Sequence, residues 1–108
     1  MTICSVPSQG DDEAFKALAN PVRRKILAAL KEPEQNFPGQ EHPYGWGVCA
    51  SKIEAAFNLS QSTVSAHLAA LHQAGLLTAK KSGQWIFYQR DEAAITALLD
   101  RLTSELSS

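Results

Sequence analysis

The sequence predicts a mainly helical domain that carries one β-hairpin, the layout of a winged helix-turn-helix. Three observations lead to this fold class. Two helical patterns are separated by the tight break Asn58-Leu59-Ser60, and the second pattern has an apolar stripe at helical spacing. The run QWIFYQR, rich in strand-forming residues, follows a small turn that contains glycine. A leucine-rich helical pattern then follows the hairpin.

Length and composition fit one small globular domain. We expect a flexible N-terminal arm over 1–10 and a single winged helix-turn-helix domain over 11–108. The 44% hydrophobic content excludes wholesale disorder, and no apolar run approaches the roughly 20 residues that span a bilayer. The first residues have neither a basic start nor a long apolar core, so they do not resemble a secretory signal. We therefore expect a cytoplasmic protein that does not contact membranes.

The first half of the domain predicts two helices and a long loop. Ala14, Phe15 and Leu18 fall on one face of a short helix over 11–19. A second helix over 21–32 begins at a proline, which suits a first helical turn. Residues 33–47 hold three prolines and three glycines around aromatic residues, which predicts a loop that is packed by its aromatics or functional.

The helix-turn-helix is predicted over 48–74. A short helix over 48–57 has apolar residues at i, i+4, i+7 and i+8 from Cys49. A capping box that starts with Ser51 would begin this helix later. Ser60 is a good N-cap for a second helix that starts at Gln61, and Gly75 is a natural stop. The buried stripe of this second helix is Val64, Leu68 and Leu71.

A hairpin and a last helix complete the domain. The segments LLTAKK and QWIFYQR are joined by a Ser82-Gly83 turn, which predicts a two-stranded wing with a basic tip. Asp91 suits the N-cap of the last helix. The apolar stripe of this helix consists of Ile95, Leu98, Leu99, Leu102 and Leu106.

The distribution of charge matters more than the net charge of −1, which by itself argues against a nucleic-acid partner. Between Ala55 and Arg90 there is no Asp or Glu. A surface that lies against phosphates should lack carboxylates, because each one would add repulsion. The alternative is chance clustering of acids in a small protein.

The second helix of the helix-turn-helix presents small residues, hydroxyls and amides on its outward side. Such a surface allows close approach to a major groove and hydrogen bonds to bases or phosphates. Because this helix lacks Lys and Arg, we expect phosphate contacts and DNA shape to contribute much of the recognition. His67 lies at the edge of the stripe and is either a packed histidine or a DNA contact. The candidate DNA-binding residues are Gln61, Ser62, Thr63, Ser65, Ala66, His67, Ala69, Lys80, Lys81, Ser82 and Gln84.

Three segments together resemble the ArsR/SmtB family of bacterial winged-helix repressors: FKALANPVRRKILAALKE, LSQSTVSAHLAALHQAGLL and KKSGQWIFYQRD. The resemblance implies a homodimer that represses transcription by binding an imperfect inverted repeat in double-stranded DNA, and releases it when a ligand arrives. It also implies that the first and last helices form the dimer interface. The corresponding residues here are Phe15, Leu18, Ile95, Leu98, Leu99, Leu102 and Leu106, of which the last stripe is also expected to serve the core.

The sequence departs from both common metal sites of that family. Where many members have two cysteines one residue apart, this chain has Gly47 and Cys49. The last helix has no histidine, and carboxylates alone are a poor Zn²⁺ site. We therefore expect no required cofactor.

Four alternatives remain for a sensing site. Cys4 and Cys49, with His42, would form a three-ligand site for a thiophilic metal or metalloid. Cys49 near a helix N-terminus could be a redox switch with Cys4 as its partner. Cys49 could instead simply fill the apolar stripe of its helix. A small organic ligand near Tyr44 and Trp46 is the fourth alternative.

Two other classes of function were weighed. An enzyme is not expected, because Ser65 and His67 are about 200° apart around a helix and no phosphate-binding glycine loop or HExxH motif is present. A winged-helix module that binds a protein instead of DNA is the alternative function. It predicts that Lys80 and Lys81 can be neutralised without loss of function.

Overall fold

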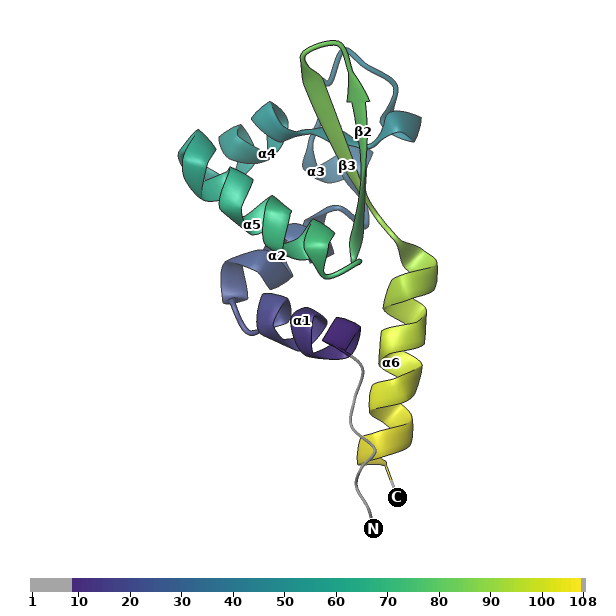
Figure 1. Cartoon of the computed structure of the whole chain (residues 1–108). Helices are drawn as coiled ribbons and strands as arrows, with labels where there is room; N and C mark the ends of the chain where they lie inside the picture. The colour runs from purple at the N-terminus through teal and green to yellow at the C-terminus, as the bar shows by residue number, and fades with distance from the viewer. Residues whose placement is uncertain (1–8, 108) are drawn as a thin grey trace.

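The computed structural model describes residues 9–107, and it confirms the winged helix-turn-helix. Figure 1 shows the hairpin rising beside the helical body and α6 extending in the opposite direction. The elements are α1 (Gln9–Leu18), α2 (Pro21–Ala29), α3 (Pro33–Asn36), the 3-10 helix η1 (Tyr44–Trp46), β1 (Val48–Cys49), α4 (Ala50–Phe57), α5 (Gln61–Gln73), β2 (Leu77–Ser82), β3 (Trp85–Arg90) and α6 (Glu92–Leu106).

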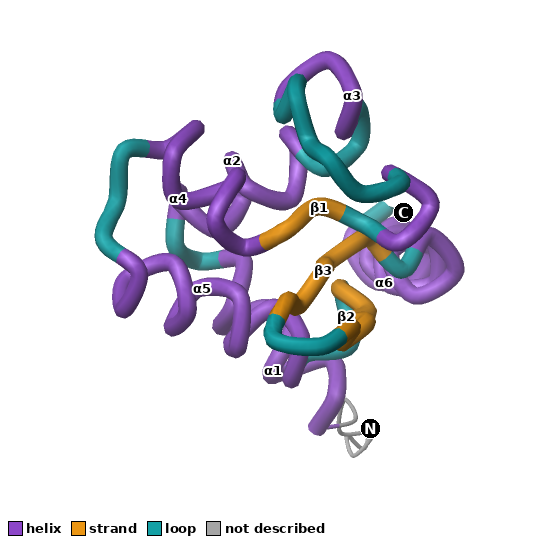
Figure 2. The backbone as a smooth tube through the Cα atoms, turned by 90° about the horizontal axis from the view of Figure 1, so that it is seen from above, coloured by secondary structure: helices purple, strands orange, loops and turns teal. Residues whose placement is uncertain are grey.

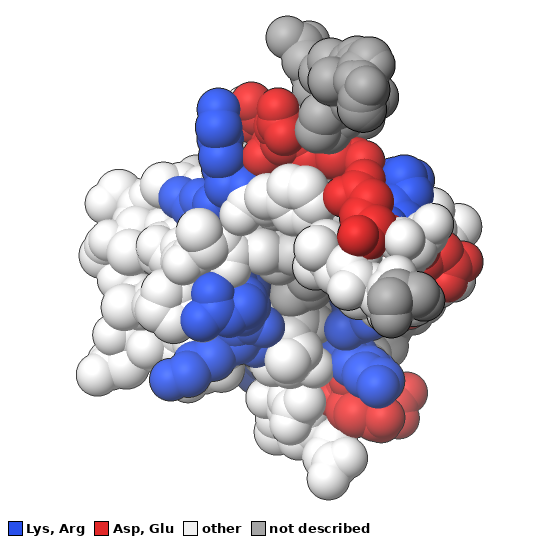
Figure 3. Space-filling model, turned by 90° about the horizontal axis from the view of Figure 1, so that it is seen from below, with Lys and Arg blue, Asp and Glu red and all other residues white. Residues whose placement is uncertain are grey.

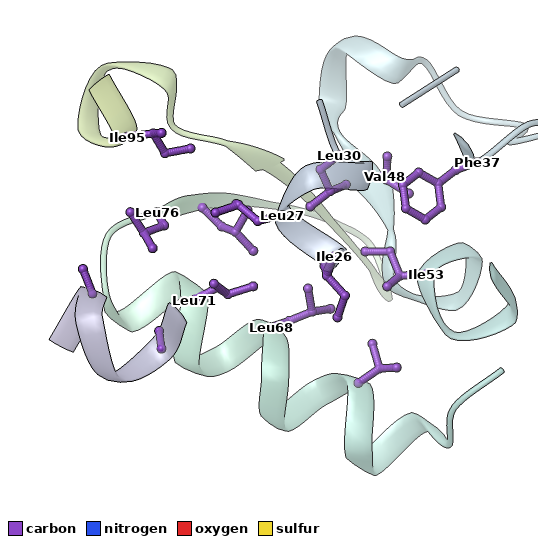
Figure 4. Packing of buried hydrophobic residues seen from close by; sticks show 14 of the residues in the cluster. Ile26, Leu27, Leu30, Phe37, Val48, Ile53, Leu68, Leu71, Leu76 and Ile95 are labelled. Carbon is purple, nitrogen blue, oxygen red and sulfur yellow. The ribbon is translucent and has the colours of Figure 1, made fainter. Parts of the chain in front are cut away.

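The core forms where α2, α4 and α5 meet. The predicted stripe of α5 is buried, with Val64, Leu68 and Leu71 each at most 1% exposed. Ile26 of α2 and Ile53 of α4 are 0% exposed and belong to the same cluster (Figure 4). Because one side of α5 is fixed in this core, its opposite side is held rigidly toward solvent.

The boundaries of α5 follow from local sequence, as predicted. Asn58 ends α4 in the left-handed conformation, with φ 53°. The Ser60 Oγ accepts a hydrogen bond from the Thr63 N–H at 3.2 Å, which caps the start of α5. Gly75 has φ 83° and its N–H donates to the His72 carbonyl at 3.0 Å, so the helix stops there.

The predicted helix over 48–57 is wrong at its start, because its first two residues form a strand. Val48 pairs with Tyr88 and Cys49 pairs with Phe87, so β1 is a third strand on the outer side of the hairpin. α4 then begins at Ala50. Two residues carry too little pattern to predict a strand, and only the presence of β3 beside them makes one.

The wing is an antiparallel hairpin whose turn lies one residue later than predicted. Ser82 pairs with Trp85, so the two turn residues are Gly83 and Gln84, and Ser82 is the last residue of β2. Gly83 has φ 61°, a conformation that glycine adopts easily at the first position of a two-residue turn.

The segment 33–47, predicted as a loop, contains the short helices α3 and η1. Its packing through aromatic residues is confirmed, since Phe37 is 1% exposed and joins the main core. The Tyr44 hydroxyl donates to the Phe37 carbonyl and accepts from the Gln40 N–H at 3.3 Å. Figure 2 shows this segment beside β1, on the side away from β2.

The Gln40 side chain ties this segment to the start of the helix-turn-helix. Its Nε2 donates to the Gly47 carbonyl at 3.0 Å, and its Oε1 accepts from the Cys49 N–H at 2.8 Å. Gly47 has φ 107°, and a Cβ placed there would lie 2.7 Å from the Tyr88 carbonyl oxygen. Glycine is therefore required where the segment passes β3.

The last helix begins at the predicted cap and packs only in part on its own chain. The Asp91 Oδ1 accepts from the Ala94 N–H at 3.0 Å. Arg101 lies further along and forms an ion pair with Asp11 of α1, with 2.8 Å between Nε and Oδ2. Across 9–107, no helix is both long enough and apolar enough to span a bilayer.

Candidate nucleic-acid interface

The solvent side of α5 carries most of the predicted contact residues. We call these residues the recognition face: Gln61, Ser62, Thr63, Ser65, Ala66 and Ala69, all of which are exposed. Their side chains are short except for Gln61, so a nucleic-acid surface can approach the helix backbone closely. The structure thus brings six of the predicted residues together on one side of one helix.

Hydroxyl groups form a small network at the N-terminal end of this face. The Ser60 Oγ donates to the Thr63 Oγ1 at 2.8 Å and lies 3.3 Å from the Ser62 Oγ. These bonds fix the rotamers of the hydroxyls before any partner binds. Preorganised hydroxyls at a helix N-terminus suit hydrogen bonds to a phosphate or a base edge.

His67 is half-buried and hydrogen-bonded, one of the two alternatives that the sequence left open. Its Nδ1 accepts from the Nε of Arg23 at 3.1 Å. A ring nitrogen that accepts a hydrogen bond is unprotonated. The hydrogen bond therefore assigns a neutral imidazole whose single N–H proton is on Nε2. Burial, and then the charge of Arg23, lower the pKa of His67 from its ordinary value. A contact to DNA through Nε2 stays a prediction.

The two wing lysines belong to opposite faces of the hairpin. Lys80 pairs with Phe87, and its Nζ lies 5.3 Å from the centroid of the Trp46 ring. Lys81 pairs with Ile86 and shares that residue's face of the sheet. Ile86 lines a cavity of about 350 Å³ together with Gln61 and Ser65 of α5. Lys81 is therefore the wing cation on the α5 side.

The polar residues at the wing tip are separated in the same way. Ser82 is half-buried as the last residue of β2. Gln84 is exposed in the turn and lines the cavity beside α5. Of these two predicted contacts, Gln84 is thus the one directed toward the recognition face.

The charges around this surface favour a polyanion. On the face seen from below in Figure 3, the left side shows basic groups and no acidic group. Glu54 of α4 lines the cavity that Gln61 and Ser65 share with the wing, so the acid-free stretch begins directly after it. Arg90, at the end of the acid-free stretch, is engaged within the chain. Its Nε forms an ion pair with Glu92 at 2.8 Å, and its Nη1 donates to the Leu27 carbonyl at 3.1 Å.

An aromatic cluster that the sequence did not predict supports the outer face of the wing. The His42 ring lies 5.0 Å from Phe87 and 5.8 Å from both Trp46 and Trp85, measured between centroids. Trp46 also meets Phe87 edge-on at 5.4 Å. The segment 33–47 therefore packs on the wing. His42 and Trp46 come from the segment 33–47 and Trp85 and Phe87 from β3, so their contacts leave no periodic pattern in the sequence.

Two of the three sensing candidates line one cavity. Cys49 is 5% exposed, and its Sγ lies 3.3 Å from the Ser51 Oγ. Cys49 and His42 both line a hollow of about 270 Å³ with Lys52. The third candidate, Cys4, lies outside the described residues. Within 9–107, no three His, Cys, Asp or Glu side chains are grouped as a metal site would require.

The predicted interface residues divide into core and surface. Ile95 and Leu98 are 9% and 3% exposed and belong to the chain's own core. Leu99 and Leu106, from the same helix, are 55% and 78% exposed. The other three residues, Phe15, Leu18 and Leu102, are half-buried.

Comparisons with known proteins agree with this geometry. The model of bacterial regulatory proteins of the arsR family matches residues 48–79. The HTH-type transcriptional regulator YbzH of Bacillus subtilis is 43% identical over 96 residues, 87% of this chain and 96% of the relative. The transcriptional repressor SdpR of the same organism is 35% identical over 77 residues, 71% of each chain. A crystal structure of an ArsR family transcriptional regulator matches with TM-score 0.68 at 20% identity, over 90% of this chain and 87% of that one.

The fold, the exposed helix and these relatives define a winged-helix transcriptional regulator that binds DNA. The chain belongs to the ArsR family, whose members are non-enzymatic regulators. The expectation that it is not an enzyme is thereby confirmed, and the alternative of a protein-binding module is set aside.

Proposed function

We propose that the protein is a homodimeric repressor that binds an imperfect inverted repeat in double-stranded DNA. The observation that carries this proposal is the recognition face itself, which is exposed, free of acids and flanked by a basic wing. Each protomer would place α5 in one major groove, with Gln61, Ser62 and Thr63 nearest the base edges. A two-fold dimer presents two such helices in opposite senses, which matches inverted half-sites.

The exposed leucines of α6 support the dimer. Leu99, Leu102 and Leu106 continue the stripe whose first part is buried in the core. Burying one leucine side chain contributes about 2 kcal/mol. A second copy would cover these leucines together with Phe15 and Leu18 of α1. In a domain of this size, such burial also supplements a small core.

Two further parts of the proposal are that the protein represses transcription and that it acts in the cytoplasm. Repression is favoured by the similarity to SdpR, which is named a transcriptional repressor. A bound dimer would block transcription by occupying the DNA. The protein would act in the cytoplasm, where that DNA lies. DNA binding in this proposal requires no cofactor.

We place the releasing signal at Cys49. Three signals are compatible with its surroundings: thiol oxidation, a small ligand, or a thiophilic metal or metalloid held with His42 and Cys4. The cavity at Cys49 adjoins the one between α5 and the wing, since both are lined by Cys49, Ser51 and Trp85. We infer that an occupant of these cavities, or oxygen added to the buried sulfur, contacts Trp85 and shifts the wing relative to α5. That displacement lowers DNA affinity if the displaced form binds DNA less well.

Fluorescence anisotropy tests this function. The purified protein is titrated into labelled DNA from upstream of its own gene and into a scrambled duplex, across salt, in reductant and then after peroxide. We expect selective binding that weakens with salt. Binding that is lost on oxidation and restored by thiol supports thiol oxidation as the signal, whereas indifference to peroxide contradicts oxidation and leaves the small ligand and the metal or metalloid. Equal affinity for both duplexes contradicts regulation of its own gene, and sedimentation velocity shows whether the bound species is a dimer.

A further inference from the structure

The first turns of α2 carry three consecutive cations where a helix prefers acids. Arg23, Arg24 and Lys25 follow Pro21 and Val22, and the first turn contains no Asp or Glu. The N-terminal end of a helix has a partial positive charge, so cations there are electrostatically unfavourable. The stability of α2 itself therefore does not explain the positive charge at this point of the surface.

Arg23 and Arg24 differ in what they contact. The Nε of Arg23 donates to the Nδ1 of His67, on α5, at 3.1 Å. Its two Nη groups have no hydrogen-bond or ion-pair partner among residues 11–107. The Nη1 of Arg24 instead donates back to the Leu18 carbonyl, at the end of α1. Arg23 is thus anchored beside the recognition helix while the rest of its guanidinium stays available.

The position of His67 places Arg23 on the flank of α5 opposite the wing. At about 100° per residue, Gln61 and Ser65 lie on one edge of the exposed side of α5, and His67 lies on the other edge. Gln61 and Ser65 face the wing, as their shared cavity with Ile86 shows. The recognition face therefore lies between two cations, Lys81 of the wing and Arg23 of α2.

The major groove of DNA has negative charge along both of its sides, as the recognition face has a cation on each of its flanks. It is about 12 Å wide, and a phosphate backbone runs along each side. A helix seated in the groove meets both backbones, and the wing reaches only one of them. Arg23 lies where the second backbone would pass, and a guanidinium can bind phosphate through two parallel N–H groups.

We propose that Arg23 binds a phosphate of the DNA strand on the side of α5 opposite the wing, and that His67 is the positioning residue that holds it there. The inference rests on the proposed seating of α5 in a major groove. It assigns to α2 a part in DNA binding that the sequence did not predict. The signal in the sequence was the basic first turn of this helix.

The test compares Arg23→Gln with the matched control Arg24→Gln. Both variants remove one positive charge from adjacent positions of one helix, so long-range attraction to DNA falls equally. Affinity is measured by anisotropy across salt on a labelled random-sequence duplex of about 30 base pairs, long enough for two half-sites. We expect Arg23→Gln to reduce the slope of log affinity against log salt by about 1 for each bound protomer. Arg24→Gln should change it far less.

Variants of His67 separate positioning from folding. His67→Asn keeps an acceptor near the place of Nδ1, whereas His67→Phe keeps the ring and removes the acceptor. We expect His67→Asn to retain the salt slope of the unchanged protein and His67→Phe to approach Arg23→Gln. Circular dichroism and thermal unfolding establish that each variant is folded.

The possible results distinguish failure of the Arg23 phosphate contact from failure of the proposed function. Equal slopes for Arg23→Gln and Arg24→Gln in a protein that binds DNA overturn the phosphate contact only. Equal slopes for His67→Asn and His67→Phe overturn the positioning role. If the unchanged protein binds neither this duplex nor its upstream DNA at low salt, the proposed function fails and this inference fails with it.

Discussion

Lys80 places its ammonium 5.3 Å from the centroid of the Trp46 ring, on the wing face that carries Phe87. The next residue, Lys81, lies on the face shared with Ile86, toward α5. Adjacent lysines in a strand point to opposite sides, so the register of the hairpin gives them different environments. One lysine contacts the segment 33–47, and the other is directed to the proposed DNA surface.

The two wing lysines should therefore differ in DNA binding. We expect Lys81→Ala to reduce the salt slope of DNA affinity by about 1 for each protomer, because one phosphate contact is lost. Lys80→Ala should affect DNA binding less and instead lower the free energy of unfolding by about 0.5–1 kcal/mol, through the lost cation–π contact. Anisotropy across salt and urea unfolding measure the two effects. A larger DNA defect for Lys80→Ala would contradict this assignment.

Gly47 should be a sensitive position for stability. In Gly47→Ala, the new Cβ would lie 2.7 Å from the Tyr88 carbonyl oxygen at a backbone φ of 107°. We expect the free energy of unfolding to fall by about 2–3 kcal/mol, from overpacking and backbone strain. Gly45→Ala is the control, because its Cβ meets no atom within 4 Å. Urea unfolding that shows similar losses for both variants would rule out the close approach as the cause.

The exposed leucines of α6 should control assembly. Leu99 is 55% exposed in the single chain, so Leu99→Glu should leave the fold of each protomer intact. A charge buried in the proposed interface would cost several kcal/mol, and we expect the variant to sediment as a monomer. Ser104→Glu, exposed on the far side of the same helix, should leave the dimer unchanged. Identical sedimentation of the two variants would contradict an interface at this stripe.

Stability should fall below neutral pH in part because of His67. Its pKa is lowered in the folded chain from the ordinary 6.5, by burial and then by Arg23. As pH decreases through 6.5, the unfolded chain therefore takes up a proton before the folded chain does, and the free energy of unfolding decreases. Above that pH both forms are neutral and this contribution is constant.

His67→Asn isolates this contribution, because the variant keeps the other two histidines and removes one titrating ring. We expect the decrease in the free energy of unfolding between about pH 7.5 and pH 5.5, one unit either side of the ordinary pKa of 6.5, to be smaller in His67→Asn than in the unchanged protein. Urea unfolding at several pH values, without DNA, makes the comparison. An equal or larger decrease in the variant would show that His67 does not have a lowered pKa.

Features with local causes could be predicted from the sequence. Ser60 and Asp91 cap helices through bonds to N–H groups three residues away, and Gly75 supplies the positive φ that stops α5. The stripe of Val64, Leu68 and Leu71 repeats within one helix. Side chains that interact within a few residues leave a pattern that can be read along the chain. For this reason the fold class and the recognition face were predictable.

Features that depend on partners distant in the sequence became visible only in the folded chain. Val48 and Cys49 form a strand because β3 lies beside them, and the predicted helix start was wrong for that reason. The position of the hairpin turn set the register that places Lys80 against Trp46 and leaves Lys81 facing α5. Arg23 meets His67 across 44 residues. Such contacts arise when separate elements pack on a shared core, and the geometry of that packing is not encoded in the spacing of any one segment.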